Sequence, residues 1–256
     1  MASSTFRRER HRVIYRLLRA LNRDLLARAG CAFGGGTLVA MRYGEHRESL
    51  DIDLLCSSGD GYRLLRETLF GTRLEPLTGK LVLVRDPVMD RDSIRTFVAD
   101  PSGTSPPVKL EVVLEGRIVI EFEDDADFPV PRLTPCCLLA EKLLANTDRG
   151  AAASESGRDF VDLLAILRHE PAATLAAAMN IAVTAYGKSV RRALDDSVRA
   201  HSNAALRRNR LVTLGVEDEW FDAETGWKAA ILAALKQAAP RAVPRTPRPP
   251  LPRSGR

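Results

Sequence analysis

Two aspartates separated by one residue stand out because an arginine and a serine precede them at the same spacing. The residues concerned are Arg47, Ser49, Asp51 and Asp53. In a β-strand alternate side chains leave by one face, so the pattern predicts a strand with a polar face that bears two carboxylates. Such a pair can hold two Mg²⁺ ions about 3.5 to 4 Å apart for phosphoryl transfer. A solvent-facing acidic pair is the alternative for the two aspartates taken alone.

A glycine run before this strand suits phosphate binding. It consists of Gly34, Gly35 and Gly36, followed by Thr37. Glycine allows the backbone to approach a phosphate closely and to present N–H groups, and Thr37 adds a hydroxyl. Arg47 could pair with a phosphate oxygen, with Ser49 as support. We therefore expect a glycine turn whose nucleotide-binding residues are Gly35, Gly36, Thr37, Arg47 and Ser49.

A third acid is expected on a neighbouring strand. Glu111 alternates with apolar residues in an extended segment, so its side chain projects away from the apolar face. It could complete a metal site with Asp51 and Asp53. A surface glutamate on an edge strand fits the pattern equally.

The elements that must position these residues divide the chain into an α/β part and a helical part. Apolar residues at helical spacing predict a helix within residues 1–30 that leads directly to the glycines, with a removable presequence as the alternative. A helix over Gly61–Leu69 should follow the strand. Extended segments that predict one mixed sheet lie at Lys80–Val84, Ile94–Val98, Val108–Leu114 and Arg117–Phe122. From Thr134 helical spacing continues to about Gln237.

This pattern predicts an α/β domain over residues 1–132 and a helical domain over residues 133–239 that completes the site. Residues 240–256 hold six prolines and five arginines, which predicts a disordered tail. No apolar run approaches the roughly 18 residues of a membrane span, so no membrane partner is expected. Four cysteines without a CxxC pair favour a reduced cytoplasm.

The net charge of +5 does not indicate a nucleic-acid surface by itself. The tail holds five arginines and no acid, so the rest of the chain is formally neutral. An RNA surface would need a local patch. The best candidate comprises Arg191, Arg192, Arg199, Arg207, Arg208 and Arg210, for which a solvated helix face is the alternative.

Three ordered motifs resemble the nucleotidyltransferase toxins of the AbiEii type, a branch of the DNA polymerase β-like superfamily. They are the glycine-to-aspartate stretch over residues 34–54, Ala140-Glu-Lys142-Leu-Leu-Ala-Asn, and Arg158-Asp159-Phe-Val-Asp162-Leu. The resemblance implies a polymerase-β-like mixed sheet followed by a helical bundle. It also assigns Asp51 and Asp53 to Mg²⁺, Lys142 to the triphosphate and Asp159 to a catalytic role.

Lys142 and Asp159, the two residues expected on helices, also have interpretations that do not depend on the resemblance. Lys142 interrupts an apolar helix face, and a buried ammonium needs an anionic partner such as a phosphate. Its alternative is a side chain that reaches out to solvent. Asp159 shares a helix face with Asp162, and it could equally form a salt bridge to Lys142 or sit as a helix N-terminal charge.

We therefore expect a nucleotidyltransferase that uses two Mg²⁺ ions to move an NMP from an NTP to an acceptor hydroxyl, with pyrophosphate leaving. The resemblance implies the 3′ end of tRNA or another RNA as acceptor, a possible cognate antitoxin as partner, and a cytoplasmic toxin. The alternatives are a protein kinase on the same fold and a catalytically inactive nucleotide- or RNA-binding module. Labelled NTP distinguishes transfer of the α-phosphate from transfer of the γ-phosphate.

Overall fold

The computed structural model describes residues 6–103, 105–124, 128–149, 157–216 and residue 231. The predicted tail over residues 240–256 lies outside this part of the chain, as does the predicted end of the helical half near Gln237. No helix in the described part is long and apolar enough to cross a membrane.

The first half of the chain builds a mixed sheet with helices packed on it. Its helices are α1 (Glu9–Ala20), α2 (Arg23–Arg28), α3 (Gly35–Arg42), α4 (Gly59–Leu69) and α5 (Glu75–Thr78). Its strands are β1 (Cys31–Phe33), β2 (Asp51–Cys56), β3 (Val82–Leu83), β4 (Val88–Met89), β5 (Ser93–Ala99), β6 (Val108–Leu114), β7 (Phe122–Glu123) and β8 (Arg132–Leu133). The strand order is β3-β5-β6-β2-β1-β8-β7, with β4 paired to β5. The mixed α/β fold expected from the sequence is thus confirmed.

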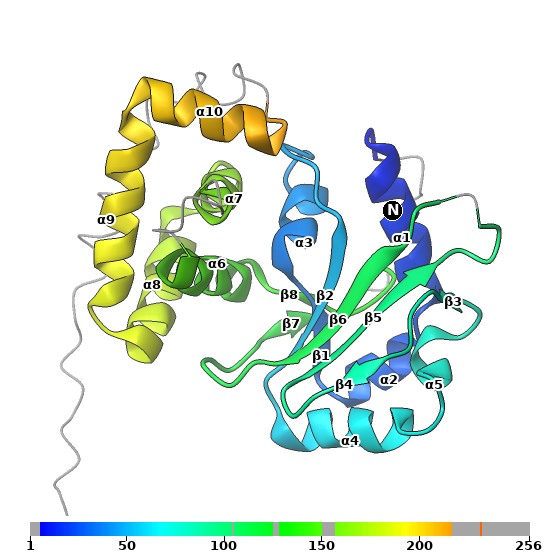
Figure 1. Ribbon diagram of the computed structural model, residues 1–256. Coiled ribbons are helices and arrows are strands. Elements are labelled where there is room, and N and C mark those ends of the chain that lie inside the picture. The colour runs from blue at the N-terminus through cyan, green and yellow to red at the C-terminus, as the bar shows by residue number, and fades with distance from the viewer. Residues whose placement is uncertain (1–5, 104, 125–127, 150–156, 217–230, 232–256) are drawn as a thin grey trace, which may run out of the picture.

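Helices make up the described part of the second half. They are α6 (Pro135–Arg149), α7 (Arg158–Leu167), α8 (Ala172–Tyr186), α9 (Ser189–Ser202) and α10 (Ala204–Leu214). Figure 1 shows these helices gathered on one side of the sheet, with α3 between them and β2. One buried apolar cluster continues from α1 through the sheet into α6 to α9. The helical half therefore packs on the sheet through a shared core.

The central strands carry the predicted acids. β2 pairs with β6 in parallel, which places Asp51 opposite Lys109 and Asp53 opposite Glu111. On the other side β2 pairs antiparallel with β1. Ile52 and Leu54 are fully buried, as their alternation with the acids predicts.

Some predicted boundaries were wrong. The strand begins at Asp51 and not at Arg47, because β6 offers pairing partners only from about this position. Arg47 and Ser49 lie on the segment that leads into the strand, and Leu50 between Ser49 and the strand is 46% exposed. The glycines begin helix α3 and do not form a separate turn, since Gly34 is its N-cap residue.

Short strands account for the other differences. The predicted segment Lys80–Val84 contains only the strand Val82–Leu83, and the segment Arg117–Phe122 contributes only its last residue to β7. Arg117 instead turns back to Glu115 through its backbone N–H and its guanidinium. The sequence did not predict the strands β1 and β8, which have three and two residues.

Candidate active site

A cavity of about 310 Å³ lies between the sheet and α6. Side chains of β2, β6 and α6 line it together with the start of α3 and the segment before β2. The predicted site residues that line the cavity are Gly35, Gly36, Arg47, Ser49, Asp51, Asp53, Glu111 and Lys142. Thr37 and Asp159 do not line it. Eight of the ten residues predicted from the sequence thus converge on one cavity.

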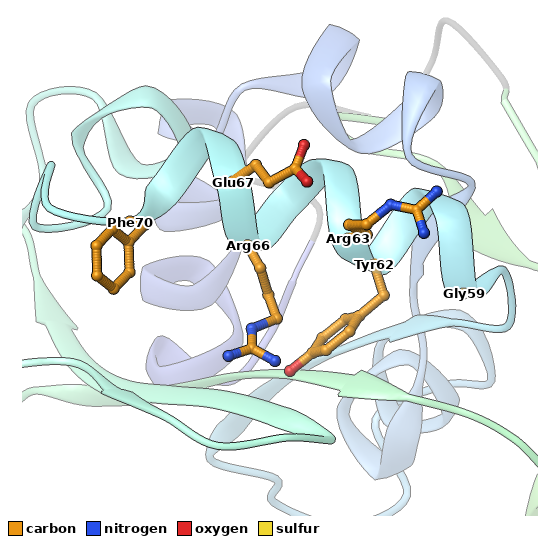
Figure 2. Close-up of a pocket in the computed structure, with 6 residues that line it drawn as sticks. All are labelled: Gly59, Tyr62, Arg63, Arg66, Glu67 and Phe70. Carbon is orange, nitrogen blue, oxygen red and sulfur yellow. The ribbon is translucent and has the colours of Figure 1, made fainter.

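A larger cavity of about 610 Å³ lies along α4 (Figure 2) and is lined by Gly59, Tyr62, Arg63, Arg66, Glu67 and Phe70. It contains none of the predicted site residues. Its one carboxylate, Glu67, has no second acid beside it in the lining, so this cavity does not offer a paired-carboxylate metal site.

The carboxylates of Asp51 and Asp53 have no direct partner among the described residues. Neither side chain forms a hydrogen bond or an ion pair within the described part of the chain, although both line the cavity. Burial and the charge of Asp51 raise the pKa of Asp53, against the opposing influence of Lys142 and Lys109. Two unpartnered carboxylates on one strand are suited to hold a divalent cation.

Glu111 is placed beside Asp53 by the strand register, but its carboxylate has protein partners. Lys109 donates a hydrogen bond to it, and the Arg95 guanidinium lies 3.9 Å away. Among the described residues, no group of three or more His, Cys, Asp and Glu side chains is arranged to hold a metal ion. The structure therefore brings Glu111 to the cavity without presenting it as a free third ligand.

The start of α3 approaches the acids very closely. The Gly34 N–H donates to the backbone oxygen of Asp53 at 2.8 Å. Gly35 has a φ of +69°, and a Cβ atom there would overlap the Asp53 carboxylate. A Cβ atom at Gly36 would overlap the Arg47 guanidinium. Since the first N–H groups of a helix lack intrahelical acceptors, the glycines bring free donors to the acids.

The Thr37 side chain contacts Ser49 and does not line the cavity. Its side chain is buried, and its hydroxyl donates to the Ser49 hydroxyl at 2.8 Å. The predicted phosphate contact through Thr37 is therefore not offered by this arrangement. The Thr37 hydroxyl instead positions Ser49, which does line the cavity.

Asp162 on α7 is the centre of a buried ionic cluster. Arg47 donates to both of its oxygens, at 2.7 Å from Nε and 2.8 Å from Nη2. Lys142 Nζ lies 2.8 Å from Oδ2, and His46 Nε2 lies 3.0 Å from Oδ1. Burial alone would raise the pKa of Asp162, but Arg47 and Lys142 hold it well below its ordinary value. Asp162 therefore remains ionised and fixes both cations.

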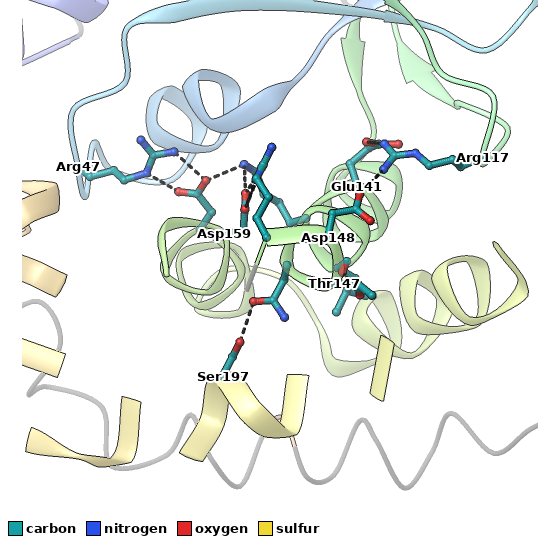
Figure 3. A network of polar contacts seen from close by, with 12 residues as sticks. Arg47, Arg117, Glu141, Thr147, Asp148, Asp159 and Ser197 are labelled. Carbon is teal, nitrogen blue, oxygen red and sulfur yellow. Dashed lines mark hydrogen bonds and ion pairs between the residues drawn. The ribbon is translucent and has the colours of Figure 1, made fainter. Parts of the chain in front are cut away.

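Asp159 is the second carboxylate that pairs with Lys142. Lys142 Nζ donates to Asp159 Oδ1 at 3.1 Å, and Arg149 donates to both Asp159 oxygens. Lys142 is only 6% exposed, so the interpretation of a side chain that reaches solvent was wrong. Despite burial, which opposes ionisation, Asp162 and Asp159 raise the pKa of Lys142. The salt bridge considered for Asp159 is present (Figure 3).

Several members of the site were not among the predicted site residues. Asp162 and Arg149 had a weak signal, because Asp162 lies one helical turn after Asp159 and Arg149 follows Lys142 on the same helix. His46 had none. The predicted arginine patch of residues 191–210 lies on α9 and α10, and none of its members is among the residues that line the cavity.

Comparisons with known proteins identify the family of this chain. A family model described as the nucleotidyl transferase AbiEii toxin of a type IV toxin-antitoxin system matches residues 16–245. No curated protein sequence matches the chain.

Solved structures with similar folds include MenT4, a nucleotidyltransferase toxin from Mycobacterium tuberculosis H37Rv. It is 17% identical, the match covers 91% of this chain and 96% of that one, and the TM-score is 0.46. An antigenic nucleotidyltransferase-like protein from Paracoccidioides brasiliensis is 18% identical over 78% and 89% of the two chains, with a TM-score of 0.46. A putative nucleotidyltransferase from Helicobacter pylori is 20% identical over 87% and 93%, with a TM-score of 0.42.

Proposed function

Since the chain belongs to the AbiEii nucleotidyl transferase toxin family, as the match over residues 16–245 establishes, we propose how this nucleotidyltransferase works and what it modifies. It transfers an NMP from an NTP to a hydroxyl of RNA, at the 3′ end of a tRNA, in a Mg²⁺-dependent reaction. It acts in the cytoplasm as a toxin with a cognate antitoxin partner. The observation that carries the reaction is the pair of unpartnered carboxylates, Asp51 and Asp53, in a cavity bordered by buried cations.

Asp51 and Asp53 would hold Mg²⁺, two ions in the proposed reaction, and Glu111 would complete the set once Lys109 releases it. Bound there, Mg²⁺ supplies charge neutralisation for the triphosphate and stabilises the attacking and leaving oxygens. Two free carboxylates on one strand face fit this role.

Lys142, Arg47 and the first N–H groups of α3 bind the triphosphate. They lie on three elements that meet at the cavity, and Gly35 and Gly36 keep the backbone open to the phosphate oxygens. Ser49, oriented by Thr37, supports this contact.

Asp159 acts as a positioning residue. Because it binds Lys142 and Arg149 and does not line the cavity, it contributes to transfer by holding these two cations. The resemblance implies a catalytic role for Asp159, and we propose that this role is indirect.

The test is NMP transfer with α-labelled and γ-labelled NTPs, Mg²⁺ and total tRNA. We expect label from the α position in tRNA, with activity lost in Asp53→Asn. The exposed Asp60→Asn variant, whose carboxylate pairs with exposed Arg63, is the matched control and should keep full activity. Label from the γ position alone would establish a kinase. NTP binding without any transfer would indicate an inactive binding module.

A further inference from the structure

The floor of the active-site cavity changes from acidic to apolar along strands β2 and β6. Beyond Asp53 and Glu111, the next residues on the same faces of β2 and β6 are Leu55 and Val113, which are paired in register and both line the cavity. Two residues along a strand correspond to about 6.6 Å. Ala145 of α6 also lines the cavity. An apolar step therefore follows the carboxylates, and it suits a flat apolar group such as the ring of a nucleobase.

Polar side chains close the cavity beyond this apolar step. We call this part, lined by Glu115, Arg117, Glu141 and Asp148, the far end. Figure 3 shows Arg117 and Glu141 on the opposite side of the polar network from Arg47. The phosphate-binding cations and the far end thus lie on either side of the apolar step.

Every donor of the Arg117 side chain is already used by described residues. Its Nε donates to Glu115 at 2.9 Å, its Nη2 to Glu141 at 3.0 Å, and its Nη1 to Asp148 at 3.2 Å. Glu115 is occupied by the same guanidinium and by the Arg117 backbone N–H. Burial and the neighbouring Glu115 raise the pKa of Glu141 to about 8, which favours its neutral form at pH 7.

Asp148 differs from these neighbours by its exposure, since the unpartnered oxygen of Glu141, Oε1, is buried. Asp148 Oδ2 accepts hydrogen bonds from Arg117 and from the Tyr186 hydroxyl, both at 3.2 Å. Its Oδ1 accepts none from a described residue, and the side chain is 45% exposed. The far end therefore offers an oriented carboxylate oxygen and no free Arg117 donor beside it.

We propose that the far end binds the base of the NTP and that Asp148 selects a base with an exocyclic amino group, an inference that rests on the proposed nucleotidyl transfer. A carboxylate accepts hydrogen bonds and repels carbonyl oxygens. It therefore favours cytosine, which has an amino group at the position where uracil has an oxygen. By the same chemistry it favours guanine over hypoxanthine, which lacks the amino group. Tyr186 is a positioning residue that orients Asp148.

The test is equilibrium binding of Mg²⁺ complexes of CTP, UTP, GTP and ITP to the full-length protein without an acceptor. In at least one of the pairs CTP/UTP and GTP/ITP, we expect the amino-bearing nucleotide to bind about tenfold more tightly or better. Asp148→Asn should bring that ratio close to one, because an amide both donates and accepts. Tyr186→Phe, which keeps the carboxylate, should lower the ratio partially, and Asp60→Asn should leave it unchanged.

The outcomes separate the two proposals. Equal binding of both members in both pairs would overturn the base assignment while leaving nucleotidyl transfer intact. Persistence of the ratio in a folded Asp148→Asn protein would also overturn the role of Asp148. Failure of every NTP to bind would overturn the proposed function and this inference with it.

Discussion

The ion pairs around Asp162 explain how cations can be buried beside the cavity in the absence of substrate. Among the described residues, Arg47, Lys142 and Arg149 form ion pairs with the carboxylates of Asp159 and Asp162. These pairs stabilise the buried cations, and Arg47 and Lys142 still line the cavity, where a triphosphate can interact with their charges.

Replacing Asp162 tests whether one carboxylate holds this cluster. Asp162→Asn leaves Lys142 and Arg47 buried beside a neutral amide, and breaking a buried ion pair typically costs about 3 to 5 kcal/mol. We expect the free energy of unfolding, measured by urea denaturation, to fall by about 3 kcal/mol, and NTP binding to weaken.

The matched control is Asp196→Asn, because Asp196 pairs with Arg199 on the exposed face of α9. Loss of such a surface pair should change the free energy of unfolding by less than about 1 kcal/mol. If Asp162→Asn were no more damaging than Asp196→Asn, Asp162 would not hold the cluster.

At the scale of the element, the glycines at the start of α3 allow this helix to approach the acids of β2 closely. Its N-terminus abuts the Asp53 carboxylate, and only a residue without a Cβ fits there. The same helix contacts β2, α6 and α7. It is therefore the element through which the metal-binding strand and the cation-bearing helices keep their mutual positions.

Two alanine substitutions separate backbone strain from this close approach. Gly35 and Gly44 both have positive φ values, +69° and +83°, so alanine at either position is strained by about 1 to 2 kcal/mol. A Cβ atom at Gly44 meets nothing within 4 Å, whereas one at Gly35 displaces Asp53. We expect Gly44→Ala to lose stability but to keep NTP-dependent thermal stabilisation, and Gly35→Ala to lose both. Wild-type NTP and Mg²⁺ binding by Gly35→Ala would contradict the assigned geometry.

Local sequence patterns predicted the helices and strands that bury one face and are long enough for their apolar residues to recur at a regular spacing. β6 has the predicted bounds, Val108–Leu114, and α4 begins two residues before its predicted start. The strands β1 and β8 are too short to show alternation of polar and apolar residues, so no local pattern predicts them.

Side-chain partners across long separations were harder to predict. The acids of β2 stood out because both requirements, spacing and residue type, are local. The pairing of Arg47 with Asp162 joins residues 115 positions apart and depends on how α7 packs against α3. The expected phosphate partner of Arg47 could therefore be named from the sequence, but its protein partner could not.

At the scale of the whole molecule, the sheet and the helical half share one core and meet again at the far end of the cavity. Arg117 connects Glu115, just after β6, with Glu141 and Asp148 on α6 and with Tyr186 on α8. The charge around Arg117 therefore depends on the protonation of the two buried glutamates, Glu115 and Glu141. One shared proton allows both carboxyl groups to lie beside a single guanidinium.

The stability of this junction should depend on pH through Glu141. Its pKa is raised from an ordinary value of 4.5 to about 8 by burial and by Glu115, while the pKa of Glu115 is lowered, against its own burial, by Arg117. Between pH 4.5 and pH 8 the folded protein therefore holds a proton on Glu141 that the unfolded chain releases. The contribution of Glu141 to the free energy of unfolding is complete below pH 4.5 and decreases as the pH rises toward 8.

Glu141→Gln removes this titration while keeping an acceptor for Arg117 and supplying a donor for Glu115. We expect the variant to gain stability relative to the wild type as the pH rises from 5 to 9, measured by urea denaturation at each pH. Glu67→Gln, on the exposed side of α4, should follow the wild-type curve. Parallel curves for Glu141→Gln and the wild type would mean that Glu141 is ionised throughout this range. The junction would then have to accommodate two charged carboxylates around Arg117.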